Sequence, residues 1–315
     1  MAQRLRTLFD GAVPGTNLGG AFTGSLAERQ VLPQAGESYF DSFYLSYKGV
    51  GAVAIVTLRA FLDLVNPFVW KDGQPRIQMQ GRDLFAFSTA WYGGAPRSEE
   101  GAAAANDWVS GIQIPLWEKI KASETYSWFA TRVAVTNIST EVLRLTLGAT
   151  EKLPPGGGSG SLYAPGDQTS GEYAIGKGRI DARTIPIILP AATGISTIIN
   201  KLPKLGRLLG LLIFNTKVPD RTTDTSSIQR LFVDSSKFRV IDAHWQDLSG
   251  GMPFRPDPST AAGVDSPAVL ALDNFGWLDL RQEPIDLVAD DYSVIADVGV
   301  ASDPVRITPI IEVPQ

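Results

Sequence analysis

The stretch KLPPGGGSGSLYAPGDQTSGEYAIGKG, residues Lys152–Gly178, lies almost at the middle of the 315-residue chain. It contains two adjacent prolines and a Gly-Ser run, and its apolar residues follow no period. Segments of this composition behave as flexible coils. The sequence therefore predicts a linker between two folded parts, the first ending near Glu151 and the second restarting near Arg179.

Both sides of the linker show the two-residue alternation of short strands. In the first half, Gly51–Val65 reads as a buried strand pair, and Trp128–Ala149 reads as a hairpin around ISTE. Ala102–Ser110 is Ala-rich and is compatible with a short helix or a surface loop. The strands predicted in the second half are Ile185–Leu189, Leu208–Asn215, Ile228–Val233, Phe238–Ala243, Ser293–Val300 and Val305–Val313. The predicted class is all-β.

The composition limits the possible functions. A hydrophobic content of 44% with 19% charged residues is enough for a sizeable core. The net charge of −5 argues against direct nucleic-acid binding, because free nucleic-acid binders are usually basic. The absence of cysteine excludes disulfides, thiolate metal sites and cysteine nucleophiles. No stretch reads as a signal peptide or a membrane-spanning helix.

The two halves contain a repeated pattern. IQMQGRDLFAFSTAW (Ile77–Trp91) aligns with LFVDSSKFRVIDAHW (Leu231–Trp245) at an offset of 154 (245 − 91). RVAVTNISTEVLRLTL aligns with DVGVASDPVRITPI at an offset of 165 (298 − 133), and GAVAIVTLRAFLDLV lies roughly over KLGRLLGLLIFNTKV. Unrelated β domains also share alternation, but the matched order and paired tryptophans favour a duplication. We therefore predict two copies of one β-sandwich.

Two tandem sandwiches with this pattern resemble the double jelly-roll major capsid proteins. These proteins build the shells of tailless icosahedral viruses, including phages with an internal membrane, and adenovirus hexon is a larger relative. The resemblance covers Ser38 to Pro314. It implies two tandem eight-stranded jelly-roll sandwiches, residues 38–151 and 179–315, joined by a Gly/Pro/Ser-rich linker at 152–178. Residues 1–37 would form an N-terminal arm.

The resemblance also implies a structural role rather than an enzymatic one, with no cofactor. Three chains with two rolls each would give a homotrimer with six lobes, which would tile the capsid lattice of a virion after synthesis in the host cytoplasm. The partners implied are other copies of the chain, penton, spike or minor capsid proteins, and the lipids of an inner membrane. The acidic balance fits a shell that a membrane separates from the genome.

The N-terminal residues carry a separate hypothesis. Arg4, Leu5, Arg6, Leu8 and Phe9 form a short basic and apolar segment outside the repeats. Such a segment suits contact with anionic lipid or with a neighbouring capsomer. The alternative is a frayed terminus. Two long segments, Tyr92–Ile112 and Ser249–Pro267, follow corresponding strands and are expected at one end of the rolls, as an exposed top or intersubunit contacts.

Candidate catalytic and metal-binding residues are few. His244 is the only histidine, so neither a cupin metal centre nor a Ser-His-Asp triad is well supported. We interpret it as a packed or hydrogen-bonded residue at a strand end. Asp257 with Asp265 suits calcium or a solvated loop, and Asp290 with Asp291 suits a carboxylate pair or a turn. The turn and loop interpretations are favoured. GGGSGS lacks the Lys-Ser/Thr of a phosphate loop.

Tryptophans cluster in the first half, and they suggest an alternative function. Exposed, they would stack on sugars in a phage spike or carbohydrate-binding protein; buried, they would belong to the core or to a subunit interface. We favour core or interface. These residues are Trp70, Trp91, Trp108, Trp117 and Trp128. No spacing among the acidic residues selects the facing pair that a glycosidase needs.

Overall fold

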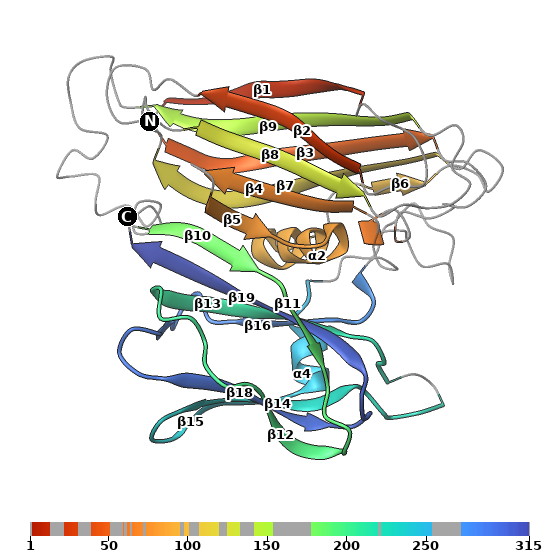
Figure 1. Ribbon diagram of the computed structural model, residues 1–315, viewed down its shortest axis with the longest axis vertical. Helices are drawn as coiled ribbons and strands as arrows, with labels where there is room; N and C mark the ends of the chain where they lie inside the picture. Colours follow the sequence, from red (N-terminus) through yellow and green to blue (C-terminus); the bar gives the residue numbers. More distant parts are fainter. Residues whose placement is uncertain are drawn as a thin grey trace.

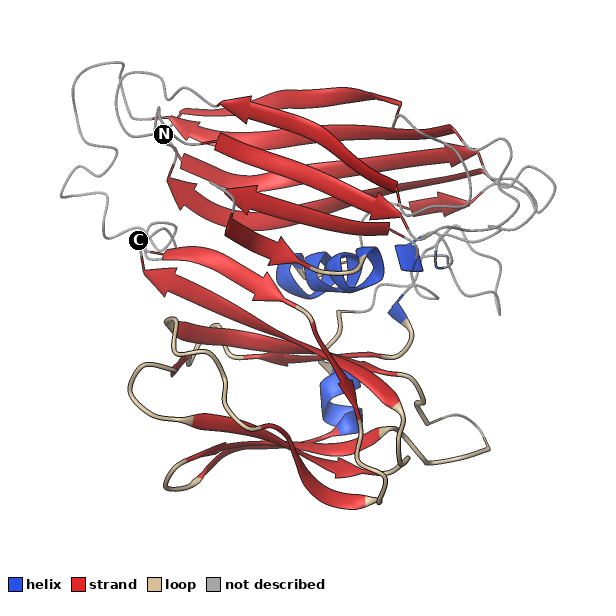
Figure 2. Ribbon diagram, in the orientation of Figure 1, coloured by secondary structure: helices blue, strands red, loops and turns tan. Residues whose placement is uncertain are grey.

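The computed structural model describes residues 2–12, 22–30, 39–50, 59, 62–63, 65–71, 74–94, 98–100, 107–119, 125–132, 142–153, 178–219, 222–253 and 272–314. Strands dominate this part of the chain, as the all-β prediction requires (Figure 2). The two halves lie one above the other, with helix α2 (Gly81–Tyr92) between them (Figure 1).

The described residues of the first half form nine strands, and β10 begins the second half. They are β1 (Ala2–Ala12), β2 (Phe22–Gln30), β3 (Tyr39–Val50), β4 (Val65–Lys71), β5 (Gln74–Gln78), β6 (Ser98–Glu100), β7 (Asp107–Lys119), β8 (Thr125–Arg132) and β9 (Val142–Leu153). The second half contains β10 (Gly178–Arg183), β11 (Ile185–Ile188), β12 (Gly194–Ile199), β13 (Arg207–Asn215), β14 (Ile228–Ser235), β15 (Arg239–His244), α4 (Trp245–Gly250), β16 (Phe275–Asp279), β17 (Ile285–Asp286), β18 (Tyr292–Val298) and β19 (Pro304–Pro314).

These strands form three sheets. A five-stranded sheet has the order β1-β9-β3-β7-β6, and a four-stranded sheet has the order β12-β18-β14-β15. The third sheet runs through both halves in the order β16-β13-β19-β10-β5-β4-β8-β2, with β11 and β17 paired to β19 and β13. Its two parts join where β10 pairs in parallel with β5, with Ala182 opposite Ile77. Each half is therefore built of two sheet layers.

Both halves have the same strand order. Counted along the chain, the eight principal strands are β1, β2, β3, β4, β5, β7, β8 and β9 in the first half, and β10, β12, β13, β14, β15, β16, β18 and β19 in the second. In each half one layer has the order first-eighth-third-sixth, and the other has the order second-seventh-fourth-fifth. A helix follows the fifth strand in both, namely α2 and α4.

The core of the second half lies between its two layers. Alternate residues of β18 point inward, with Val294, Ala296 and Val298 buried. They meet Leu231 on β14 and Leu211 on β13, which are also fully buried. The alternation visible in the sequence therefore marks the inward face, because successive side chains of a strand point to opposite sides. All six strands predicted in this half are confirmed, as β11, β13, β14, β15, β18 and β19.

The alignment of Ile77–Trp91 with Leu231–Trp245 was wrong. Strand β5 ends at Gln78, and Gly81–Tyr92 is a helix that Gly93 ends with a left-handed φ of 73°. Every residue from Gly81 to Trp91 is buried. A helix covered on all sides has no polar stripe, so its apolar residues show no helical period in the sequence. The 154-residue alignment therefore placed the helix over residues 235–246, which include the whole of strand β15.

The predicted hairpin at Trp128–Ala149 was also wrong. Strand β8 pairs with β2 and β4, whereas β9 pairs with β1 and β3 in the other layer. Both segments alternate, but alternation does not say which sheet a strand joins. The 165-residue alignment nevertheless matched equivalent strands, since β8 and β18 begin 292 − 125 = 167 positions apart and β9 and β19 begin 304 − 142 = 162 apart.

Other segments of the first half also differ from the predictions. Arg59, Leu62 and Asp63 are helical, not part of a strand pair. Residues 107–110 begin β7, which also shortens the expected loop before Ile112. The range 1–37 contains β1 and β2, so it includes sheet strands rather than only a separate arm. Residues 154–177 and 254–271, which hold most of the linker and of the second long loop, lie outside the described residues.

Truncating the core residue Leu211 to alanine should lower the free energy of unfolding by about 2–5 kcal/mol, because it leaves a cavity between the layers. Ile188 is the control, since its side chain is 70% exposed and Ile188→Ala should change the value little. Urea unfolding followed by tryptophan fluorescence measures both. Equal losses in the two variants would contradict the placement of the core.

Candidate functional site: the junction between the two halves

Two adjacent charged residues begin the helix between the halves. Arg82 and Asp83 lie in the first turn of α2, and their exposed fractions are only 2% and 1%. Charged side chains are rarely buried without partners, because removing them from water costs several kcal/mol. Each of these two side chains finds most of its partners in the second half of the chain.

Arg82 is held mainly by the segment before β16. Its Nη2 donates to the backbone oxygen of Asp273 at 2.5 Å. The guanidinium carbon lies 5.1 Å from the ring centre of Phe214 and 5.4 Å from that of Phe275. Asp63, from the first half, lies 3.8 Å from Nη1. The helix is thus attached to β13 and β16 through one cation between two aromatic rings.

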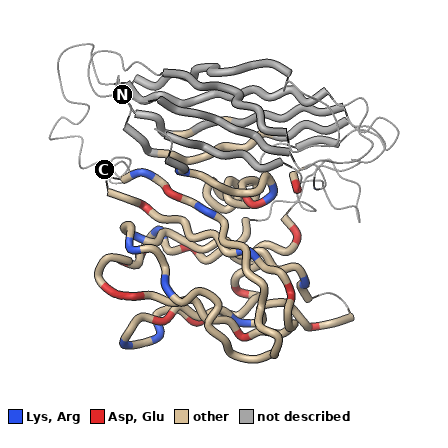
Figure 3. The backbone as a smooth tube through the Cα atoms, viewed as in Figure 1, with Lys and Arg blue, Asp and Glu red and all other residues tan. Residues whose placement is uncertain are grey.

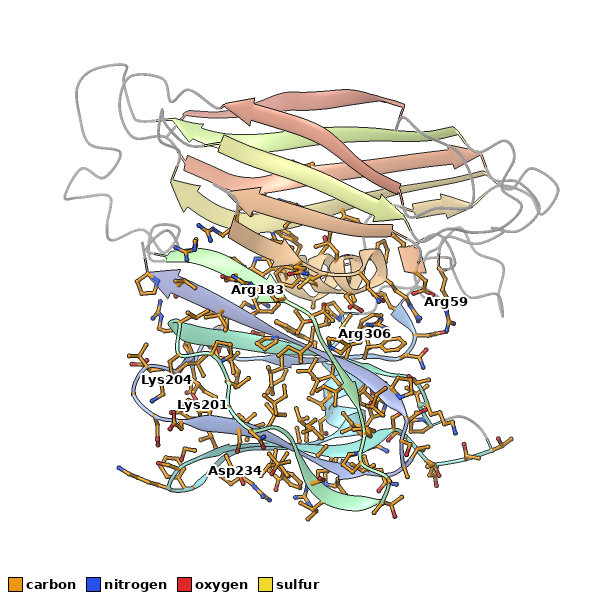
Figure 4. All side chains as sticks on the ribbon, viewed as in Figure 1. Arg59, Arg183, Lys201, Lys204, Asp234 and Arg306 are labelled. Atoms are coloured by element: carbon orange, nitrogen blue, oxygen red, sulfur yellow. The ribbon has the colours of Figure 1, made fainter. Side chains whose placement is uncertain are left out.

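The carboxylate of Asp83 accepts a bidentate pair of hydrogen bonds from the guanidinium of Arg306 on β19. Arg306 Nη2 lies 2.7 Å from Oδ1, and Nε lies 3.0 Å from Oδ2. Thr184 Oγ1 donates to Oδ2 at 3.2 Å and accepts a hydrogen bond from Thr308 Oγ1 at 2.9 Å. Arg306 lies just below α2 in Figure 4. Bidentate pairing of this kind fixes direction as well as distance.

Burial shifts the pKa of both charged residues toward their neutral forms. It lowers the pKa of Arg82 to about 10, although Asp63 acts in the opposite direction. Arg82 therefore stays charged at neutral pH. Burial also raises the pKa of Asp83, while the charge and hydrogen bonds of Arg306 oppose that rise. The carboxylate is consequently stable in this place only while Arg306 and Thr184 remain against it.

Two further contacts attach the halves at the ends of α2. Arg281, before β17, donates from Nη1 to the backbone oxygen of Trp91 at 2.6 Å and lies over its ring. Asp279 holds the same guanidinium at 2.6 Å. At the other side, the N–H of Thr184 donates to the oxygen of Gln78 at 2.9 Å, extending the β5–β10 pairing. The junction therefore combines sheet pairing, buried charges and ring contacts.

The residues of the N-terminal hypothesis lie in β1. Arg4, Leu5 and Arg6 are opposite Glu151, Thr150 and Ala149 of β9, and Phe9 is opposite Leu147 after a bulge. β1 is the first strand in the order of its sheet. The residues thus belong to a paired strand at the edge of its sheet, on the other side of β9 and β3 from β7, the strand of that sheet against which α2 lies.

Two of the other candidate residues, His244 and Trp91, have structural roles. His244 is the exposed last residue of β15, and its N–H donates to Asp247 Oδ2 at 3.2 Å, so the strand-end interpretation is confirmed. Trp91 is buried, as favoured above. The side chains of Trp70, Trp108, Trp117 and Trp128, and all of Asp257 and Asp265, lie outside the described residues.

Asp290 and Asp291 do not share a site. Asp290 Oδ2 accepts from Ser236 Oγ at 2.9 Å, whereas Asp291 Oδ1 accepts from Lys201 and Lys204 at 2.7 and 2.9 Å. The hydrogen bond from Ser236 lowers the pKa of Asp290, and the one from Lys201 lowers that of Asp291. The turn interpretation is confirmed, because each carboxylate is committed to a different loop.

The described residues offer little for chemistry. They contain no group of three or more His, Cys, Asp or Glu able to hold a metal ion, and no helix among them is long and apolar enough to cross a membrane. A hollow of about 330 Å³ beside α4 is lined by mainly apolar residues such as Trp245, Met252, Leu272 and Phe275. Asp273 is the single ionisable residue in its lining, and it is committed to the junction.

The sequence interpretation missed the junction residues. Arg82, Asp83 and Arg306 were not singled out, although a charged pair beside the apolar run LFAF is a signal of buried, partnered charge. A second signal was available in the repeat itself. Arg-Ile-Thr at 306–308 on β19 matches Arg-Leu-Thr at 144–146 on β9, the equivalent strand.

Several solved structures of viral capsid proteins share this arrangement. The major capsid protein of STIV matches with a TM-score of 0.65 and 11% identity, over 100% of this chain and 97% of that one. The chain has the fold of viral major capsid proteins. The atomic structure of Sulfolobus Turreted Icosahedral Virus matches with a TM-score of 0.63 and 12% identity, over 99% and 91%.

A more distant match is the PBCV-1 virus capsid, with a TM-score of 0.52 and 7% identity, over 99% of this chain and 94% of that one. No protein-family model and no curated protein sequence matches the chain. The likeness thus lies in the arrangement of strands and not in residue identity. It confirms at the level of fold the resemblance drawn from the repeat.

Replacing Arg306 by alanine should cost about 3–5 kcal/mol of unfolding free energy at pH 7, because Asp83 is left buried and unpaired. The pKa of Asp83 in the folded variant then rises further above its unfolded value of about 3.9. The folded variant therefore binds the proton more tightly than the unfolded chain, so the loss should shrink as the pH falls toward 4. Urea unfolding at pH 7 and pH 4.5 measures this.

Arg230→Ala is the matched control. Arg230 pairs with Asp242 in an equally bidentate way, but both side chains are more than one-third exposed. Exposed pairs contribute about 1 kcal/mol or less. A loss for Arg306→Ala that is the same at both pH values would show that Asp83 does not depend on this partner.

Proposed function

We propose that the chain is the major capsid protein of an icosahedral virus and acts by assembly rather than catalysis. One observation carries the proposal: two sandwiches of the same strand order are fixed to each other by buried contacts, in a fold that matches a viral major capsid protein over nearly its whole length. A capsid subunit has to hold its lobes at a fixed angle, and the junction supplies that rigidity.

We further propose that the two sandwiches are jelly rolls, so that the chain is a double jelly roll. An eight-stranded jelly roll is a two-sheet arrangement of two Greek keys, and the shared strand orders of the two halves support it. The proposed boundaries are 38–151 and 179–315, with 152–178 as the linker. Because β1 and β2 belong to the first two layers, we extend the first roll to include them.

Three chains would then close into a ring of six lobes. Closed rings with an odd number of subunits use heterologous contacts, in which two different surfaces of the chain meet. Permanent contacts of this kind commonly bury several thousand Å². Positive and negative residues are interspersed over the second half (Figure 3), which favours specific pairing between copies over a general attraction to nucleic acid.

The mass of the purified protein tests this function. One chain is 33.9 kDa, so a homotrimer should read about 100 kDa by light scattering on a sizing column. Electron microscopy of the same sample should show six lobes. A strict monomer at micromolar concentration would contradict the proposal and favour a spike or carbohydrate-binding protein, which a glycan array would then examine.

The setting of the capsid is a further part of the proposal. We place the protein in the virion of a tailless phage, above an inner membrane, with penton, spike or minor capsid proteins as neighbours and with the host cytoplasm as its place before assembly. The acidic net charge supports separation from the genome. Arg4, Leu5, Arg6, Leu8 and Phe9 of β1 would contact membrane lipid or a neighbouring copy.

Replacing Arg4 and Arg6 together by alanine tests the lipid contact without removing the β1–β9 backbone pairing. The wild-type protein should float with vesicles containing about one-third phosphatidylserine, and the double variant should lose most of this binding, because each basic residue near an anionic surface contributes about 1 kcal/mol. Lys201→Ala with Lys204→Ala is the control, as both lysines pair with Asp291. Equal binding by all three proteins would refute the lipid contact.

A further inference from the structure

Helices α2 and α4 occupy equivalent places in the two halves. Each follows the fifth strand of its sandwich and lies against the sixth and fourth strands, β7 and β4 for α2, and β16 and β14 for α4. Asp83 and Asp247 are each the third residue of their helix. The two helices can therefore be compared position by position.

Their burial differs sharply. In α2, every residue from Gly81 to Trp91 is buried, because the second half of the chain covers the helix. In α4, only Trp245 and Leu248 are buried, while Gln246 and Asp247 are exposed. The carboxylate of Asp83 is held by Arg306, whereas that of Asp247 accepts the N–H of His244 at its own helix start. α4 thus presents the surface that α2 has covered.

The surface that covers α2 has a counterpart elsewhere in the chain. Arg306 and Thr308 of β19 stand opposite Phe214 and Leu212 of the third strand, β13. Arg144 and Thr146 of β9 stand opposite Lys48 and Ser46 of the third strand of the first half, β3. The two Arg-x-Thr sequences therefore lie on equivalent strands, β19 in the second half and β9 in the first half. Each is paired with the corresponding part of the third strand of its own half.

The strand edges repeat the same relation. Inside the chain, the fifth strand of the first half, β5, pairs in parallel with the first strand of the second half, β10. Their counterparts are β15 and β1, and each of these stands at the end of its sheet among the described strands. The second half thus carries a free strand, β15, of the kind that pairs inside the chain, and the first half carries the matching free strand, β1. Two different, complementary surfaces of this kind are the requirement for head-to-tail association.

We propose that α4 and β15 of one copy dock on β9 and β1 of a second copy, with Asp247 against Arg144, so that the junction inside the chain is reproduced between chains. The proposal rests on the assembly function above and names the surfaces that would close the ring. Gln246 of α4 occupies the position that Arg82 has in α2. The contact between copies would therefore bury only the ion pair of Asp247 with Arg144, whereas the internal junction buries Arg82 in addition to its ion pair. The partner is a second copy of this chain.

Charge reversal tests the pair. Asp247→Arg alone and Arg144→Asp alone should each raise the protomer concentration at which the trimer half-dissociates by about tenfold or more, because each places like charges together. The double variant should recover most of the wild-type value. Sedimentation velocity over a dilution series measures all four proteins.

The rescue separates this contact from a local effect on α4. Asp247 also accepts a hydrogen bond at the start of its helix, and a loss of that bond cannot be repaired by changing Arg144. Glu283→Arg, an exposed acid in the loop before β17, is the control for net charge and should leave the trimer unchanged. If the wild type is a trimer and the double variant is no better than the single ones, the proposed contact is wrong while the assembly function stands. If the wild type is a monomer, the assembly function itself fails, and the inferred contact fails with it.

Discussion

The buried pair of Asp83 and Arg306 is the interaction on which the arrangement of the two halves depends. A carboxylate that is 1% exposed needs its partner in place, and that partner comes from 223 positions further along the chain. Because a buried charge without its partner is costly, the pair favours the observed position of α2 against β19. Arg82, held between the rings of Phe214 and Phe275, adds a second contact between the helix and the second half.

This attachment explains why one sheet extends through both halves. The parallel pairing of β5 with β10 involves few residues, and a pairing that short would not hold two sandwiches by itself. The charges and rings around α2 supply the remaining rigidity. A subunit with two lobes in a fixed relation can tile a lattice, whereas two lobes on a flexible linker could not set the angle between neighbouring contacts.

The repetition of strand order gives the chain two versions of the same surfaces. One version is used inside the chain, where α2 meets β19. The other version consists of α4, which belongs to the second half, and β9, which belongs to the first half. Proteins built from a duplicated domain often reuse one contact within and between chains, because a surface that already fits its counterpart needs few changes to fit a second copy. The Arg-x-Thr sequence occurs on both of the equivalent strands, β9 and β19.

The sequence by itself determined the all-β class and six of the strands of the second half, because alternation is a local property of a strand. Only the tertiary structure decided that β8 and β9 belong to different layers, since alternating segments pair equally well with several neighbours. It also decided that Gly81–Tyr92 is a helix, because contact with both halves removed the polar face that would have revealed its period. Asp83 and Arg306 were brought together by folding alone, since nothing in the order of residues joins two charges so far apart.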